Sequence, residues 1–251
     1  MTPLEAIAVL LAGMFAGGIN TVVGSGTLVT FPVLMAVGYP PVVATVSNSL
    51  GLVPGSVTGA IGYRRELAGQ RERLIRLGVC SVLGGATGSV LLLTLPPDAF
   101  ETIVPVLIAL ALVLVVAQPW LARVIAARQA ATQQHGGVPL QFAIYGTGVY
   151  GGYFAAAQGI LLLGFMGVLM DEELQRLNAV KNVLTALVNA VAGTVYVFVA
   201  PVAWPAAVLI AVGATMGGVL GARVGRKLPP VVLRGVIVVV GLAAIIQMLL
   251  R

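Results

Sequence analysis

The sequence predicts an all-α integral membrane protein with two inverted-topology repeats of about five helical elements each, and short or broken helices at the centre. Three observations predict this fold class. Of the 251 residues, 59% are hydrophobic and only 9% are charged, whereas soluble domains carry about 25% charged residues. The two halves share an ordered series of glycines and prolines. Arginine-rich loops fall at non-equivalent places in the halves, which requires opposite orientations.

The first half of the chain contains five apolar segments. We expect its elements over residues 4–20, 28–37, 42–62, 77–95 and 100–118. Small and polar residues over 20–27 interrupt the first helix. The 28–37 run is too short to cross a core of about 30 Å alone, because a helix rises about 1.5 Å per residue. It is either a tilted helix extended by its flanks or one half of a re-entrant pair.

The second half repeats this plan after a polar linker. We expect elements over residues 140–157, 160–170, 178–199, 205–222 and 231–250, with a break at Gln158–Gly159. The chain therefore divides into a first repeat (1–118), a cytoplasmic linker (119–139) and a second, inverted repeat (140–251).

Matching residues lie at an offset that drifts only from 135 to 133 between the halves. The pairs are Gly17 with Gly152, Gly24 with Gly159, Asn48 with Asn182, Gly59 with Gly193, and Leu95-Pro96-Pro97 with Leu228-Pro229-Pro230. Such an ordered series indicates duplication. Glycines four residues apart predict close helix contact instead of a ligand site; they are Gly51, Gly55 and Gly59, Gly84 and Gly88, and Gly217 and Gly221.

Charge predicts the orientation of each repeat. The loop from Arg64 to Arg76 is basic and is expected to be cytoplasmic, whereas its counterpart at 200–203 carries no charge. Residues 96–98 lack lysine and arginine, but their counterpart is flanked by basic residues. Opposite orientation requires an odd number of crossings per repeat, so we expect ten elements, both termini outside and the linker inside. Contact with anionic lipid is a second role open to the arginine loop.

Lys181, between Asn178 and Asn182, is the principal candidate for a functional site. A charge at the centre of a membrane helix costs about 2.5–3.5 kcal/mol, so such residues usually serve function. These three side chains share one helical face and offer a positive charge and amide donors to a small anion. Two alternatives remain. Lys181 could extend to the interface, or it could pair with an acidic residue at 171–173.

The two helix breaks complete the predicted site. Helix N-termini present free N–H groups and partial positive charge, which suit an anion, and inverted repeats with broken helices are typical of secondary transporters. Close helix packing alone is the alternative for Gly24-Ser25-Gly26. The predicted substrate-binding residues are Asn20, Gly24, Ser25, Gly26, Thr27, Ser47, Asn48, Gln158, Gly159, Asn178, Lys181 and Asn182.

The composition argues against several other functions. All eight acidic residues fall in loops or at helix ends, which disfavours cation transport and proton antiport through a buried carboxylate. One cysteine and one histidine offer no metal cluster, disulfide or catalytic triad. We therefore expect no enzyme activity, no cofactor and no metal. The net charge of +6 reflects topology and not nucleic-acid binding.

Two motifs resemble those of the TauE/SafE sulfite-exporter family. The first is Gly17-Gly18-Ile19-Asn20, then Gly24-Ser25-Gly26, Pro32-Val33-Leu34 and Gly38-Tyr39-Pro40-Pro41; the second runs from Gly148 through Gln158-Gly159 to Arg176–Asn182. The resemblance implies export or exchange of sulfite, or of organosulfonates such as sulfoacetate, across the bacterial inner membrane. Ser25 and Thr27 depart from the consecutive glycines of that motif and add hydroxyl donors.

Within this hypothesis Lys181 is the counter-charge of the anion, Asn48 and Asn182 are paired donors, and the two breaks are backbone cradles. An anion channel, or a carrier for a different small anion, is the alternative. The expected partners are the small anion and membrane lipid; a homodimer is left open.

Overall fold

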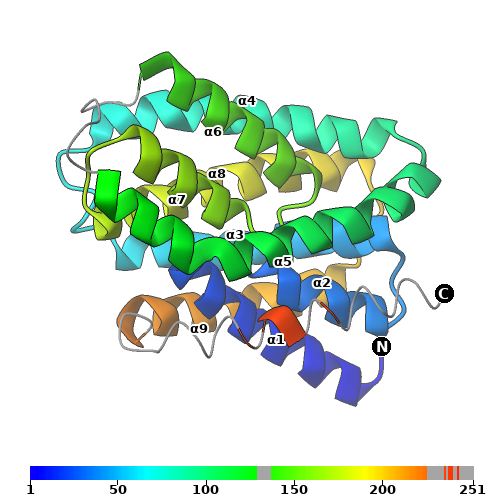
Figure 1. Cartoon of the computed structure of the whole chain (residues 1–251). Coiled ribbons are helices and arrows are strands. Elements are labelled where there is room, and N and C mark those ends of the chain that lie inside the picture. Colours follow the sequence, from blue (N-terminus) through cyan, green and yellow to red (C-terminus); the bar gives the residue numbers. More distant parts are fainter. Residues whose placement is uncertain (129–136, 225–234, 236, 240–241, 243–251) are drawn as a thin grey trace.

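The computed structural model describes residues 1–128, 137–224, 235, 237–239 and 242, and within these ranges all regular secondary structure is helical (Figure 1). The helices are α1 (Pro3–Val22), α2 (Thr27–Ala36), α3 (Pro41–Gly62), α4 (Arg71–Thr94), α5 (Pro97–Arg128), α6 (Gly137–Tyr153), α7 (Gln158–Leu169), α8 (Leu174–Val199) and α9 (Trp204–Val224). Helices α1, α4, α8, α9 and the central part of α5 are long and apolar enough to cross a membrane. The protein is therefore a multi-pass, all-helical membrane protein, as the composition predicted.

Local sequence explains several helix boundaries. Thr2 caps α1 in a capping box with Glu5, and Pro3 occupies the first turn, where its missing N–H is not needed. Pro41 begins α3 in the same way. Gly38 has a φ of +99° in the turn after α2, a conformation that glycine adopts most readily.

Some predicted boundaries were wrong. Helix α4 begins at Arg71, so the second half of the expected basic loop is helical, and α8 begins at Leu174, four residues before the expected start. Helix α5 continues to Arg128 and α6 begins at Gly137, which makes both ends of the predicted linker helical. Arginine, leucine, glutamine and alanine are good helix formers, so α4, α5 and α8 extend beyond their apolar segments. The predicted helix over 231–250 lies almost wholly outside the described residues.

Helices α1, α3 and α9 form a first bundle in which all three run in the same direction. A Cβ atom added to Gly17 would lie 2.2 Å from the Ala214 carbonyl oxygen, and one added to Gly55 would lie 2.7 Å from the same atom. Gly13 and Gly51 make the corresponding contacts four residues earlier, both with Ile210. The absence of side chains lets the backbones approach closely, which confirms the packing role predicted for Gly51 and Gly55.

Helices α4, α6 and α8 form a second bundle of the same kind. A Cβ atom on Gly84 would lie 2.3 Å from the Tyr145 carbonyl oxygen, and one on Gly88 would lie 2.0 Å from that of Val149. Helix α8 also packs on α4, where Gly85 of α4 lies close to Val188 of α8. Each bundle thus contains two helices from one predicted repeat and one from the other.

The two bundles meet along α3 and α8, which run in opposite directions (Figure 1). Leu50, in the first half of α3, packs on Gly193 near the end of α8, whereas Val57 and Ile61 lie beside Val183 and Leu187. If the repeats are inverted, their equivalent third helices, α3 and α8, should run antiparallel. The inverted relation itself stays a prediction.

Charged side chains gather at one end of the molecule. The α3–α4 loop, the α7–α8 loop and the end of α9 lie there, and this basic end carries Arg64, Arg65, Arg73, Arg176 and Arg223. The N-terminus, the α4–α5 turn and the 200–203 segment lie at the opposite end (Figure 1). The positive-inside rule predicts that the basic end faces the cytoplasm.

Candidate functional site

The two helix breaks touch each other at the centre of the molecule. The N–H of Gly159 donates to the carbonyl of Gly24 at 3.0 Å. A Cβ atom on either residue would lie 2.4 Å from the Cα of the other, and Gly24 has a φ of +89°. Ala155 and Ala157 also have positive φ, which is uncommon for residues other than glycine. The predicted equivalents Gly24 and Gly159 are therefore direct neighbours.

Lys181 is completely buried beside this contact. Its Nζ atom donates to the carbonyl oxygens of Asn20 at 2.9 Å and Thr21 at 3.1 Å. These carbonyls belong to the last turn of α1, where backbone acceptors lack partners within the helix and the dipole favours a cation. A Cβ atom on Gly159 would lie 3.0 Å from Cδ of this lysine, so its side chain lies against the break.

Neither alternative for Lys181, extension to the membrane interface or an ion pair with an acidic residue at 171–173, is observed. Because the side chain is 0% exposed, its ammonium group does not extend to solvent. Among the residues that the structure describes, no carboxylate lies within ion-pair distance of its nitrogen, and Glu172 pairs with two arginines instead.

Asn178 and Asn182 lie on the same face of α8, as predicted. Each donates from Nδ2 to the Thr21 carbonyl at 3.3 Å. Thr21 therefore accepts from three side chains of α8, and these contacts attach the second bundle to the end of α1 in the first. The sequence did not indicate this acceptor, because a backbone carbonyl has no residue-type signature.

The remaining predicted donors make contacts within the first half of the chain. Asn48 donates to the Thr27 hydroxyl at 3.1 Å and accepts from the hydroxyl of Thr30, which joins α3 to the first turn of α2. Asn20 donates to the Ser56 hydroxyl at 3.1 Å. Thr30 was not predicted; its spacing of three from Thr27 on a short apolar helix is the signal that could have indicated it.

Ser47 has a different environment from the other predicted residues. Its hydroxyl accepts a hydrogen bond from the Ala203 N–H at 2.9 Å, so it holds the segment before α9. The structure therefore brings the residues of the two breaks together with the polar face of α8 but assigns Ser47 a contact with a separate loop.

The first turns of α2 and α7 are buried and lack side-chain caps. Their N-cap residues are Gly26 and Ala157, neither of which supplies a capping side chain. Three side-chain groups at the breaks are also buried without a hydrogen-bond partner in the described residues: the Ser25 hydroxyl, the Gln158 amide and Oδ1 of Asn178. Unpaired buried polar groups are costly, so these groups are available to a bound molecule or to water.

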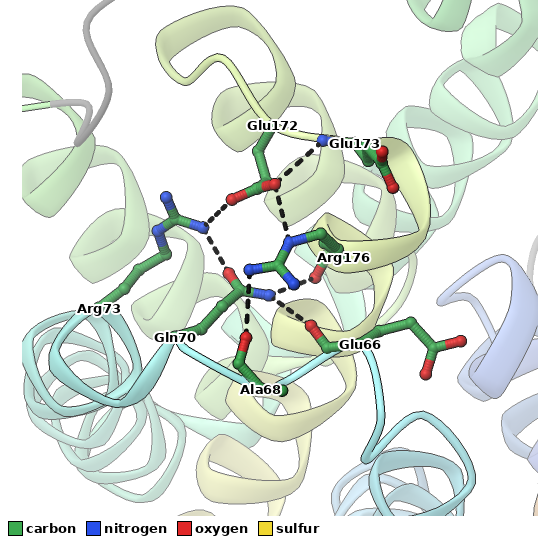
Figure 2. Close-up of polar contacts among 7 residues, drawn as sticks. All are labelled: Glu66, Ala68, Gln70, Arg73, Glu172, Glu173 and Arg176. Atoms are coloured by element: carbon green, nitrogen blue, oxygen red, sulfur yellow. Dashed lines mark hydrogen bonds and ion pairs between the residues drawn. The ribbon is translucent and has the colours of Figure 1, made fainter.

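A second polar cluster lies at the basic end and joins the two predicted repeats (Figure 2). Glu172 binds Arg73 at 2.7 Å and Arg176 at 2.8 Å. Arg176 also donates to the Ala68 carbonyl at 3.2 Å, and the buried Gln70 donates to the carbonyls of Glu66 and Arg176. The cluster fixes the start of α4 against the start of α8.

Two opposing effects act on the pKa of Glu172. Partial burial raises the pKa. Hydrogen bonds from Arg73 and Arg176, together with their positive charges, lower it by a larger amount, so the pKa lies below its usual value. The carboxylate therefore stays ionised at neutral pH and holds both arginines.

Comparisons with known proteins agree with the sequence motifs. A family model described as "Sulfite exporter TauE/SafE" matches residues 9–248. "Probable membrane transporter protein YfcA" of Escherichia coli (strain K12) is 25% identical over 249 residues, covering 96% of this chain and 88% of the relative. "Probable membrane transporter protein ORF9" of Sinorhizobium sp is 26% identical over 245 residues, covering 95% and 90%. No solved structure gives a significant match.

Proposed function

The chain belongs to the sulfite exporter TauE/SafE family of membrane transporters, and we propose that it carries a small sulfur-containing anion. The proposed substrates are sulfite or an organosulfonate such as sulfoacetate. Transport is outward across the bacterial inner membrane, by alternating access at the interface of the two repeats. Direction and substrate class follow the family's description as exporters.

One observation carries this proposal: two uncapped helix N-termini meet beside a buried lysine. Backbone N–H groups and the partial positive charge of a helix N-terminus stabilise anions. Two of the three hydrogens on the Lys181 ammonium are directed at the end of α1. The third has no acceptor among the residues that the structure describes and is available to the anion, and within the same residues the Ser25 hydroxyl and Gln158 amide are unpartnered donors nearby.

The position of Lys181 also connects binding to movement. The lysine belongs to α8 of the second bundle, but its hydrogen bonds go to α1 of the first. A rotation of one bundle against the other changes these contacts directly. Glycine packing keeps each bundle rigid, so the α3–α8 interface and the helix breaks are where alternating access would be accommodated.

Counterflow in proteoliposomes tests the proposal. Vesicles are loaded with labelled sulfite, and unlabelled sulfite, sulfoacetate, sulfate, chloride and acetate are supplied outside in turn. We expect exchange with sulfite or the sulfonate and little exchange with chloride or acetate. Labelled sulfite that no outside anion releases, together with exchange of labelled chloride or acetate loaded in its place, would reject the substrate class while leaving the carrier. Flux that does not saturate and shows no counterflow would indicate a channel.

A further inference from the structure

An apolar groove of about 370 Å³ lies between α3 and α8 towards the basic end. Aliphatic side chains line it, among them Val57 and Ile61 from α3 and Val183 and Leu187 from α8. Val57 is 42% exposed and Ile61 is 53% exposed, so the groove opens on the outer surface of the helices. In a membrane protein that surface faces hydrocarbon, and the groove has room for an aliphatic chain.

Arg64 is the one charged residue among those described that line this groove. It also lines a second cavity, of about 450 Å³, which lies between the ends of α3 and α9. Arg65 and Arg223 line the second cavity as well, together with the single carboxylate of Glu66. The cavity therefore carries an excess of positive charge and adjoins an apolar groove through a shared arginine.

These arginines differ from the others at the basic end. Arg73 and Arg176 are held by Glu172 in the polar cluster of Figure 2. In the described part of the chain, the guanidinium groups of Arg64, Arg65 and Arg223 have no hydrogen-bond or ion-pair partner. Arginine matches the geometry of a phosphate group and can bind it through two parallel hydrogen bonds. This part of the basic end is thus equipped to bind a phosphate.

We propose that an anionic phospholipid binds here, with its headgroup phosphate on Arg64 and one acyl chain in the α3–α8 groove. A soluble phosphate would use the arginines but leave the groove empty, and a neutral lipid would fill the groove but leave the arginines unpaired. Anionic lipids are attracted to clustered arginines at the cytoplasmic surface, where the basic end is predicted to lie. Because α3 and α8 belong to different bundles, the lipid contacts both.

Thermal unfolding of the full-length protein in detergent tests this site. The purified protein is titrated with short-chain phosphatidylglycerol, with phosphatidylcholine of the same chain length, and with inorganic phosphate. We expect phosphatidylglycerol to raise the unfolding temperature most strongly. Arg64→Gln should weaken its apparent affinity by about fivefold, in line with the contribution of one arginine near a lipid surface. Arg123→Gln, at the same end but on α5, should leave the affinity unchanged.

A groove-filling variant, Ala190→Phe, separates the acyl chain from the headgroup. It should weaken the effect of phosphatidylglycerol even though every arginine is retained. Equal affinity in Arg64→Gln and Arg123→Gln would overturn the proposal, as would equal effects of the two lipids. A shift reproduced by inorganic phosphate alone would show a soluble-anion site instead. A dimer that Ala190→Phe dissociates, with no response to lipid, would show that a second copy covers the groove.

Discussion

Lys181 is the residue at which burial, charge and hydrogen bonding combine. It is fully buried and bound to two carbonyls at the end of α1. We predict that Lys181→Met, which keeps the length of the side chain but removes the charge, abolishes counterflow of sulfite or sulfonate. The matched control is Thr194→Val, an exposed position on the same helix. If a well-folded Lys181→Met protein exchanged the anion at the wild-type rate, transport would not depend on this charge.

Gly24 and Gly159 allow a second prediction at single residues. Gly24→Ala places a methyl group 2.4 Å from the Gly159 backbone and at a positive φ, and overpacking of this kind costs about 1–3 kcal/mol. We expect a lower unfolding temperature, or too little folded protein to measure. Gly146→Ala is the matched control, because no described atom beyond its chain neighbours and its own helix backbone lies within 4 Å of its Cβ position. Equal unfolding temperatures for the two variants would contradict the close crossing.

At the scale of single residues, the sequence predicted some contacts of the candidate site and missed others. Gly24 and Gly159 were paired by their offset of 135, and they proved to be neighbours in space. The polar face of Lys181 and its flanking asparagines was predicted from helical spacing alone. Their acceptor on α1 was not, because a backbone carbonyl 160 residues away leaves no trace in residue type. Ser47 fitted the polar composition of the site but serves a different loop.

At the level of helices, the Glu172 cluster connects the start of α4 to that of α8 and should depend on pH. The pKa of Glu172 is lower in the folded protein than in the unfolded chain. Its contribution to stability is therefore complete above the unfolded pKa, about 4.3, and is lost as pH falls through the folded value. We predict that Glu172→Gln lowers stability at pH 7 by about 1 kcal/mol, since the pair is partly exposed.

The control for this prediction is Glu173→Gln, because Glu173 is exposed and contacts the cluster only through its backbone N–H. The unfolding temperatures of the wild type and of Glu172→Gln should converge as the pH is lowered below about 4. A difference that persists unchanged in acid would mean that the ion pairs do not account for the effect.

Helix boundaries were less predictable than helix order. The apolar segments located nine elements in the correct order within the described residues, since membrane spans require long apolar runs. The early start of α4 at Arg71 escaped prediction because a helix continues into polar sequence wherever its residues favour helix. The pairing of Arg73 with Glu172, 99 residues away, depends on packing that no local pattern encodes.

For the whole molecule, the packing partners follow the predicted repeat correspondence. In the predicted repeats α1 is equivalent to α6, α3 to α8 and α4 to α9. The equivalent of the α1–α9 contact is therefore the α6–α4 contact, and that of α3–α9 is α8–α4. All four contacts are present. The α3–α8 contact is its own equivalent, and these helices are antiparallel. A two-fold axis perpendicular to the helices would produce such an arrangement, as it does in inverted repeats. The inverted relation stays a prediction, and these contacts are what it requires.

Orientation in the membrane gives the last prediction. If the basic end is cytoplasmic, Ala68 in the α3–α4 loop faces inward and Pro201 before α9 faces outward. Both residues are exposed, and Cys80 is the single native cysteine. In a Cys80→Ala background, a membrane-impermeant maleimide added to intact spheroplasts should therefore label Pro201→Cys and spare Ala68→Cys until the membrane is broken. The reverse pattern would invert the topology, and labelling of both sites in intact cells would contradict a single orientation.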